Sequence, residues 1–280
     1  MISSFCIKNN HTNIINFLLE DLENFSSNYI IISNSEFKIF KNVIVHCRKK
    51  NFNEALDLLC LSLFRTIIKF YEDRLLKMIL KENYFYFSYE EQSKILKLAT
   101  INLNEDILNY ETKKLIMIKE LKKYLYNHKN IVLEGLVFFR LPEYMNFLDC
   151  VLASTINEFI IEKEYNEFIN LLKVYISTTK SSVECVHLIY NKNMCFLLDK
   201  NLNYIENDEE MFKLKYLSDI SFSDNDYTLN SLLNLLPQKI HLHLLSDEDE
   251  FIKTLKKIFN QKISICTNCN ICRLYNQKKI

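Results

Sequence analysis

Residues 52–75, FNEALDLLCLSLFRTIIKFYEDRL, decide the fold class because their apolar side chains recur at steps of three and four. These side chains form two faces, one made of Phe52, Leu56, Leu59, Leu63, Ile67 and Phe70, and the other of Cys60, Phe64, Ile68, Tyr71 and Leu75. A helix that is apolar on two faces is buried inside a larger body. The sequence therefore predicts a helical middle built around this segment.

The helical pattern continues on both sides of this segment, from residue 49 to residue 180. Ser88 and Glu91 have the spacing of a capping box, which starts the next helix. Pro142 suits the first turn of a long helix that reaches about Ile176, with a kink or break expected near Ser154–Asn157. The polar run 177–182, STTKSS, predicts the loop that ends the helical region.

The first 48 residues have a mixed pattern. We expect a strand at Ile2–Ile7, a helix at His11–Phe25, and two strands at Tyr29–Ile32 and Phe37–Cys47. The run Ser33-Asn34-Ser35 lies between these two strands and is the expected hairpin turn. The order is strand, helix, strand, strand.

The last hundred residues are mixed again. Val183–Tyr190 and Met194–Leu198 flank a hairpin signal at residues 191–193. Farther on, strands at Lys239–Leu245 and Gln261–Ile265 enclose a helix that Ser246 is expected to cap. A strand, helix and strand joined by short loops form a parallel pair with a right-handed crossover.

These patterns together predict an α+β fold in three segments. Residues 1–48 form a small βαββ unit, residues 49–180 a helical domain, and residues 181–280 an α/β unit with a parallel strand pair. The third segment ends in a CxxCxxC tail.

Composition excludes several classes of function. Lys plus Arg and Asp plus Glu both number 35, and this zero net charge gives no general attraction to nucleic acid. The single glycine, Gly135, cannot build a P-loop, a dinucleotide fingerprint or a nucleophile elbow. The chain has neither a signal-peptide pattern at MISSFCIKNN nor an apolar run long enough to cross a membrane. We therefore expect a cytoplasmic protein that neither inserts into membranes nor binds nucleic acid.

Three of the nine cysteines lie close together, at Cys266, Cys269 and Cys272, directly after the last predicted strand. This spacing lets successive thiolates turn onto one metal ion or an iron–sulfur cluster. His243 lies on the neighbouring parallel strand and is the candidate fourth ligand. Zinc and an iron–sulfur cluster both remain open as cofactors, and so do a redox-active thiol set and a reduced tail without a role.

A second constellation lies in the helical middle. Gly135 stands in an apolar run, which suggests a close backbone approach or a positive φ. Glu158 and Glu162 share a helix face, and Arg140 is the expected ion-pair partner of one of them between packed helices.

The sequence resembles the YtxC family, which is linked with sporulation in endospore-forming low-G+C bacteria. The resemblance rests on residues 134–141 (EGLVFFRL), residues 159–168 (FIIEKEYNEF) and Ile265-Cys266-x-x-Cys269-x-x-Cys272. It implies a role in sporulation but no known reaction, so it supplies no catalytic residue and leaves open whether the protein is an enzyme.

Two hypotheses about function follow. The first is a non-enzymatic cytoplasmic sporulation factor that binds another protein of unknown identity. The second is a metal- or iron–sulfur-dependent enzyme or redox sensor that uses the cysteine triple. A nucleic-acid binder is a third reading, and the neutral chain without a basic stripe argues against it.

Overall fold

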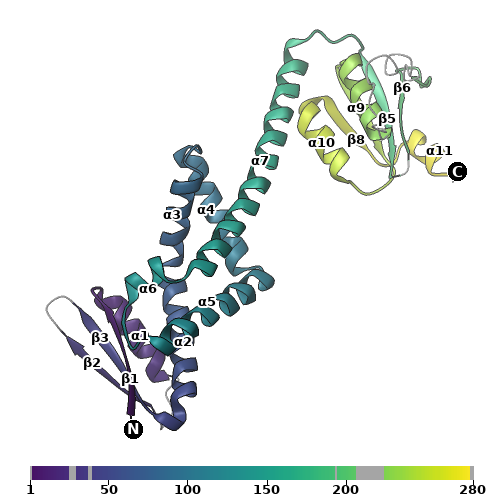
Figure 1. Cartoon of the computed structure of the whole chain (residues 1–280). Helices are drawn as coiled ribbons and strands as arrows, with labels where there is room; N and C mark the ends of the chain where they lie inside the picture. Colours follow the sequence, from purple (N-terminus) through teal and green to yellow (C-terminus); the bar gives the residue numbers. More distant parts are fainter. Residues whose placement is uncertain (1, 25–29, 37–39, 193, 206–223, 278–280) are drawn as a thin grey trace, which may run out of the picture. The chain divides into compact units, whose positions relative to one another are not determined.

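The computed structural model describes residues 2–24, 30–36, 40–192, 194–205 and 224–277 (Figure 1). The chain forms two compact units, residues 1–161 and residues 162–280, and each unit has its own hydrophobic core. The fold is α+β, which confirms the prediction. Whether the three sequence segments 1–48, 49–180 and 181–280 fold independently stays a prediction.

The N-terminal unit contains a four-stranded sheet with the order β2-β3-β1-β4. Its strands are β1 (Ile2–Asn9), β2 (Ile30–Glu36), β3 (Lys41–Arg48) and β4 (Asn130–Val132). The first three strands and helix α1 (Thr12–Asn24) form the predicted βαββ unit, with β3 antiparallel to both β1 and β2. The sequence reading missed β4, which pairs in parallel with β1 from far along the chain.

The predicted turn at Ser33-Asn34-Ser35 is wrong. These residues belong to β2, where Ser33 pairs with Ile44 and Ser35 with Asn42. Polar residues occur here without ending the strand because alternate residues of this edge strand point away from the core. Residues 37–39, which join β2 to β3, lie outside the described part of the chain.

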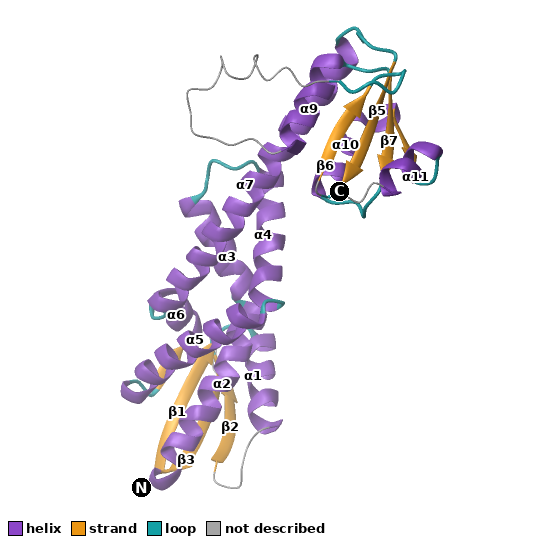
Figure 2. Ribbon diagram, turned by 90° about the vertical axis from the view of Figure 1, so that its right-hand side faces the viewer, coloured by secondary structure: helices purple, strands orange, loops and turns teal. Residues whose placement is uncertain are grey.

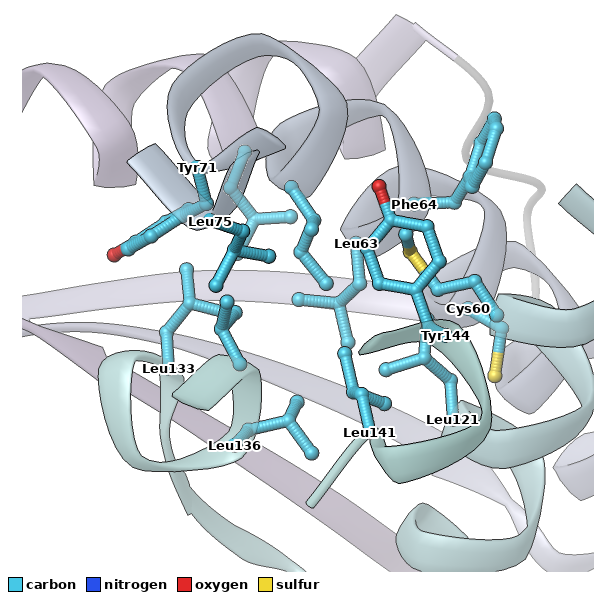
Figure 3. Close-up of a cluster of buried hydrophobic side chains, with 14 of the residues drawn as sticks. Cys60, Leu63, Phe64, Tyr71, Leu75, Leu121, Leu133, Leu136, Leu141 and Tyr144 are labelled. Atoms are coloured by element: carbon cyan, nitrogen blue, oxygen red, sulfur yellow. The ribbon is translucent and has the colours of Figure 1, made fainter. Parts of the chain in front are cut away.

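The helices of this unit pack on one face of the sheet and on one another (Figure 2). They are α1, α2 (Phe52–Phe70), α3 (Glu72–Asn83), α4 (Tyr89–Asn104), α5 (Ile107–Asn127), α6 (Leu133–Phe139) and the first half of α7 (Pro142–Thr178). Helix α2 is central, as predicted, because both of its apolar faces are buried. Figure 3 shows Leu63 and Phe64 of α2 among Leu121 of α5, Leu136 of α6 and Tyr144 of α7.

The helix predicted over residues 52–75 is interrupted at Tyr71. Tyr71 has φ −124° and ψ −27°, so α2 ends at Phe70 and α3 begins at Glu72. The buried hydroxyl of Tyr71 accepts a hydrogen bond from Nδ2 of Asn9 at 2.7 Å. This contact across the core joins the interruption to the end of β1.

Helices α4 and α7 are capped at their starts in two different ways, one local and one by a distant side chain. The Ser88 Oγ accepts from the backbone N–H of Glu91 at 3.3 Å, and the Glu91 carboxylate accepts from the N–H of Ser88 at 2.9 Å, which confirms the capping box. Helix α7 is continuous through residues 154–157, so the kink or break expected there is wrong. At its start, the carboxylate of Glu120 accepts from the N–H groups of Glu143 and Tyr144. A side chain of α5 therefore satisfies the first turn of the long helix.

Two expectations for the second constellation are wrong. Gly135 lies inside α6 with a negative φ, and a Cβ there would meet nothing within 4 Å. Among the described residues no ion pair joins Arg140 to Glu158 or Glu162, and the side chain of Arg140 is exposed. The reason is distance, since the helix rises about 24 Å from Pro142 to Glu158 at roughly 1.5 Å per residue.

The C-terminal unit contains the second sheet, with the order β6-β5-β7-β8. Its strands are β5 (Cys185–Asn191), β6 (Met194–Leu198), β7 (Lys239–Leu244) and β8 (Ile263–Cys266). The β5–β6 hairpin and the parallel β7–β8 pair confirm two predictions. Helices α9 (Asp224–Leu235) and α10 (Glu250–Phe259) bury one face of this sheet.

Two details of this unit differ from the sequence reading. The cap of α10 is Asp249, whose carboxylate accepts from the N–H of Ile252 at 3.1 Å, and not Ser246. A further helix, α11 (Asn270–Gln277), follows β8 where a tail was expected. Within the described part of the chain, no helix has the length and apolar character that a membrane span requires.

The N-terminal core encloses one polar cluster. The ammonium of Lys113, which is fully buried, donates to both carboxylate oxygens of Glu72 at 3.0 Å and to Oδ1 of Asn104 at 2.9 Å. The hydroxyl of Tyr144 donates to the same carboxylate at 2.7 Å. Burial lowers the pKa of Lys113, and the Glu72 carboxylate opposes that shift. Because the four side chains come from α3, α5, α4 and α7, the cluster ties four helices together.

We predict that Lys113→Ala lowers the free energy of unfolding by about 3–5 kcal/mol, because it leaves the buried Glu72 carboxylate without its cation. Lys114→Ala is the matched control, since the side chain of Lys114 is 36 % exposed and pairs with Glu111 at 3.8 Å. Its loss should stay below about 1 kcal/mol. Urea unfolding of the full chain measures both values, and equal losses would contradict the prediction.

Candidate metal centre

The face of the second sheet that α9 and α10 leave open carries a group of polar side chains. Ile240 and Leu242 of β7 point into the core, so His241 and His243 point to the opposite face. The pairing register places His187 of β5 opposite His241, and Cys266 of β8 opposite His243. Three histidines and one cysteine therefore share this face.

Helix α11 covers part of this face. Figure 1 and Figure 2 show α10 and α11 on opposite sides of the strands. Cys269 precedes the first residue of α11, and its Sγ accepts from the backbone N–H of Cys272 at 3.5 Å, as an N-cap side chain does. The ring of Tyr275, one turn farther on, lies 5.1 Å from the ring of Phe196 on β6.

The start of α11 brings the three thiols together. The Sγ of Cys272 lies 3.7 Å from the Sγ of Cys269 and 3.9 Å from the Sγ of Cys266. Nδ1 of His243 lies 3.4 Å from the Sγ of Cys269 and 3.4 Å from the Sγ of Cys272. All four ligand atoms are within 4.8 Å of one another, and this is the one such cluster among the described residues.

Burial sets the protonation states at this cluster. His243 is 3 % exposed, and burial, together with the neighbouring His187 and His241, lowers its pKa to about 4. The imidazole is therefore neutral at pH 7, which is the form that binds metals. Burial also raises the pKa of Cys272 to about 11.

The pKa of Cys269 is shifted in the opposite direction from that of Cys272. Burial acts to raise the pKa of its thiol, but hydrogen bonds from the backbone N–H of Cys272 and from the other thiols outweigh burial and hold the pKa below its usual value. A sulfur at a helix N-terminus is stabilised as the thiolate. The cluster therefore combines a neutral imidazole with a thiol, that of Cys269, which ionises more readily than the thiol of Cys272.

Comparison with known proteins identifies the family. The model of the YtxC-like family matches residues 58–264, about three quarters of the chain. The chain belongs to the YtxC-like family. It is 23 % identical over 211 residues to the uncharacterized protein YtxC of Bacillus subtilis (strain 168), covering 71 % of this chain and 74 % of that protein. No solved structure matches the chain.

The YtxC-like match covers the framework of the candidate centre and stops just before its thiols. His187 and His243 lie within the matched residues, whereas Cys266, Cys269 and Cys272 follow the end of the match at residue 264. The family assignment therefore rests on the helical region and the C-terminal sheet, and the cluster has to be argued from its own geometry.

Sequence reasoning had singled out the three cysteines and His243, and the structure brings all four together. It missed His187, whose Nδ1 lies 3.0 Å from Nε2 of His243. The signal was the parallel pairing of β5 with β7, which the sequence did not reveal. Six other cysteines lie outside the cluster: Cys6, Cys47, Cys60, Cys150, Cys185 and Cys195.

We predict that in reduced protein without bound metal, as long as α11 remains helical, Cys269 reacts with iodoacetamide at least about tenfold faster than Cys272, because the thiolate is the nucleophile. Cys272 is 1 % exposed, whereas Cys269 is partly exposed at the start of α11. The exposed thiol of Cys150 serves as the reference for the iodoacetamide reaction rate of a solvent-accessible cysteine. Tandem mass spectrometry of the peptide 263–273 separates the two adducts, and similar rates would overturn this assignment.

Proposed function

We propose that the C-terminal unit binds one zinc ion through Cys266, Cys269, Cys272 and His243, and that this ion holds α11 on the sheet. In a tetrahedral zinc site, Zn–S bonds of about 2.3 Å and Zn–N bonds of about 2.0–2.1 Å place sulfur atoms roughly 3.8 Å apart and sulfur and nitrogen roughly 3.6 Å apart. The sulfur–sulfur distances of 3.7 and 3.9 Å and the sulfur–nitrogen distances of 3.4 Å support the proposal.

The same distances favour a single ion over an iron–sulfur cluster. In a cluster with four irons each thiolate binds a different iron, so the sulfur ligands stand farther apart than they do around one ion. A set of thiolates with one imidazole, arranged tetrahedrally, is typical of zinc.

The ligand set also favours a structural site over a catalytic one. Four protein ligands fill a tetrahedron and leave no position for water or substrate. The two innermost ligands, His243 and Cys272, are 3 % and 1 % exposed. This argues for a protein that uses zinc to hold its shape, and against the alternative of a metal-dependent enzyme or redox sensor.

The expected result is about one equivalent of zinc in full-length protein purified without oxygen. Changing Cys266, Cys269 and Cys272 to serine should abolish zinc binding and unfold α11, while the N-terminal core stays folded. The matched control changes Cys6, Cys150 and Cys185 to serine, which removes three thiols outside the cluster.

Elemental analysis and circular dichroism measure these outcomes. Less than about 0.2 equivalents of any metal in the unmodified protein would refute the site. A brown protein that contains iron and sulfide would instead support the iron–sulfur alternative.

We further propose that the protein is a non-enzymatic cytoplasmic factor of sporulation that acts by binding another protein. The resemblance of the sequence to the YtxC family supports this cellular role, and the closed ligand set supports a role without catalysis.

Deleting the gene in a spore-forming host should reduce the number of heat-resistant spores, and the unmodified gene should restore it. The triple-serine gene should fail to restore it, because the partner would meet a protein without an ordered α11. Normal spore yield and timing after deletion would exclude the sporulation role. Full rescue by the triple-serine gene would show that the sporulation role does not require the zinc ion.

A further inference from the structure

A second histidine contacts the candidate ligand His243 from the neighbouring strand. Nδ1 of His187 lies 3.0 Å from Nε2 of His243, while Nδ1 of His243 lies 3.4 Å from two of the thiols. We infer that His187 is a positioning residue of the proposed zinc site, whose Nδ1 accepts the Nε2–H of His243 and so leaves Nδ1 of His243 free for the metal. This inference rests on the proposed zinc site.

Neutral imidazole carries a proton on one ring nitrogen and a lone pair on the other. The nitrogen of His243 that faces the thiols is Nδ1, so a metal bound among them takes the Nδ1 lone pair and the proton resides on Nε2. At 3.0 Å this Nε2–H is within hydrogen-bond distance of Nδ1 of His187, which must then be the acceptor. His187 therefore carries its own proton on Nε2.

The sheet holds this pair in place. His187 and His243 lie on adjacent parallel strands, and His243 pairs with Ile189, two residues along β5 from His187. Their ring centroids are 5.3 Å apart with an interplanar angle of 21°, so the two rings meet edge to edge along the 3.0 Å line that joins the two nitrogens. This in-plane contact fixes the orientation of the His243 ring before any metal arrives.

His241 is the natural comparison, because it stacks on the same residue without contacting the ligand. Its ring centroid lies 5.1 Å from that of His187, and its Nδ1 is 2.7 Å from Oγ of Ser264. The described contacts thus give His241 a ring contact with His187 and a hydrogen bond to Ser264, without the nitrogen–nitrogen contact that joins His187 to His243.

Residues that orient a metal-binding histidine typically change metal affinity by about 10–100-fold when they are replaced. We expect His187→Phe, which keeps a ring and loses the acceptor, to weaken zinc binding by about that factor. His187→Asn can place its Oδ1 near the position of Nδ1 and should recover most of the affinity. His241→Phe should bind zinc as the unmodified chain does.

The experiment uses the full chain throughout. Competition with a chromophoric chelator measures the zinc Kd of each variant, and melting curves show whether each variant is folded. In parallel, 15N–1H spectra of the zinc-loaded, unmodified protein with labelled histidine report which nitrogens of His187 and His243 carry protons. We expect protons on Nε2 of both residues, and faster exchange of the His243 proton with water in His187→Phe.

Each outcome counts for or against the inference. Zinc bound through Nε2 of His243 in the unmodified protein overturns it, whatever the variants do. A folded His187→Phe protein with unchanged Kd also overturns it and leaves the zinc site standing, and so does equal weakening by His241→Phe. An unmodified chain that binds no zinc removes both the inference and the proposed function.

Discussion

A β-sheet has two faces, and the C-terminal unit depends on how its second face is covered. Helices α9 and α10 bury the first face with a core of aliphatic side chains. The second face receives α11, which has eight residues and few apolar side chains. A helix of this length is not stable by itself in water. The cysteines at its start and the ring of Tyr275 are therefore central to its attachment.

The N-terminal unit depends instead on the burial of one central helix, α2. Helix α2 is apolar on two faces and is covered by the sheet, α1, α5 and the chain around α6 and α7 (Figure 3). Inside that core, Lys113 and Glu72 form a polar cluster whose remaining hydrogen bonds come from Asn104 and Tyr144. A buried ion pair is satisfied only in one arrangement of its neighbours. The cluster thus selects one packing of four helices among the many that aliphatic contacts alone would permit.

Much of the fold could be predicted because the patterns behind it are local. Periodicity placed most of the helices and strands, and the capping box at Ser88 starts its helix as expected. The failures depend on contacts distant in the sequence. Strand β4 is three residues long and exists only because β1 lies beside it. Tyr71 interrupts an apolar helical pattern where its hydroxyl meets Asn9.

The residues of the candidate site likewise fall into those that local sequence patterns predict and those that depend on distant contacts. Three cysteines at intervals of three are visible in any sequence, and the β7–β8 pair made His243 a reasonable neighbour. His187 could not be found, because nothing local reveals that β5 lies beside β7. Helix α11 was missed because its start is defined by the Sγ of Cys269, a sulfur cap that sequence rules do not include.

The parallel pairing of β1 with β4 has a consequence for synthesis of the chain. Strand β1 leaves the ribosome first, and β2 and β3 can join it as soon as residue 48 has emerged. The other edge of β1 must wait for Asn130–Val132. During that interval β1 presents an unpaired strand edge, which is a surface on which nascent chains associate wrongly. The N-terminal sheet is therefore a part of this protein for which the pace of translation, or a chaperone near the exit tunnel, matters.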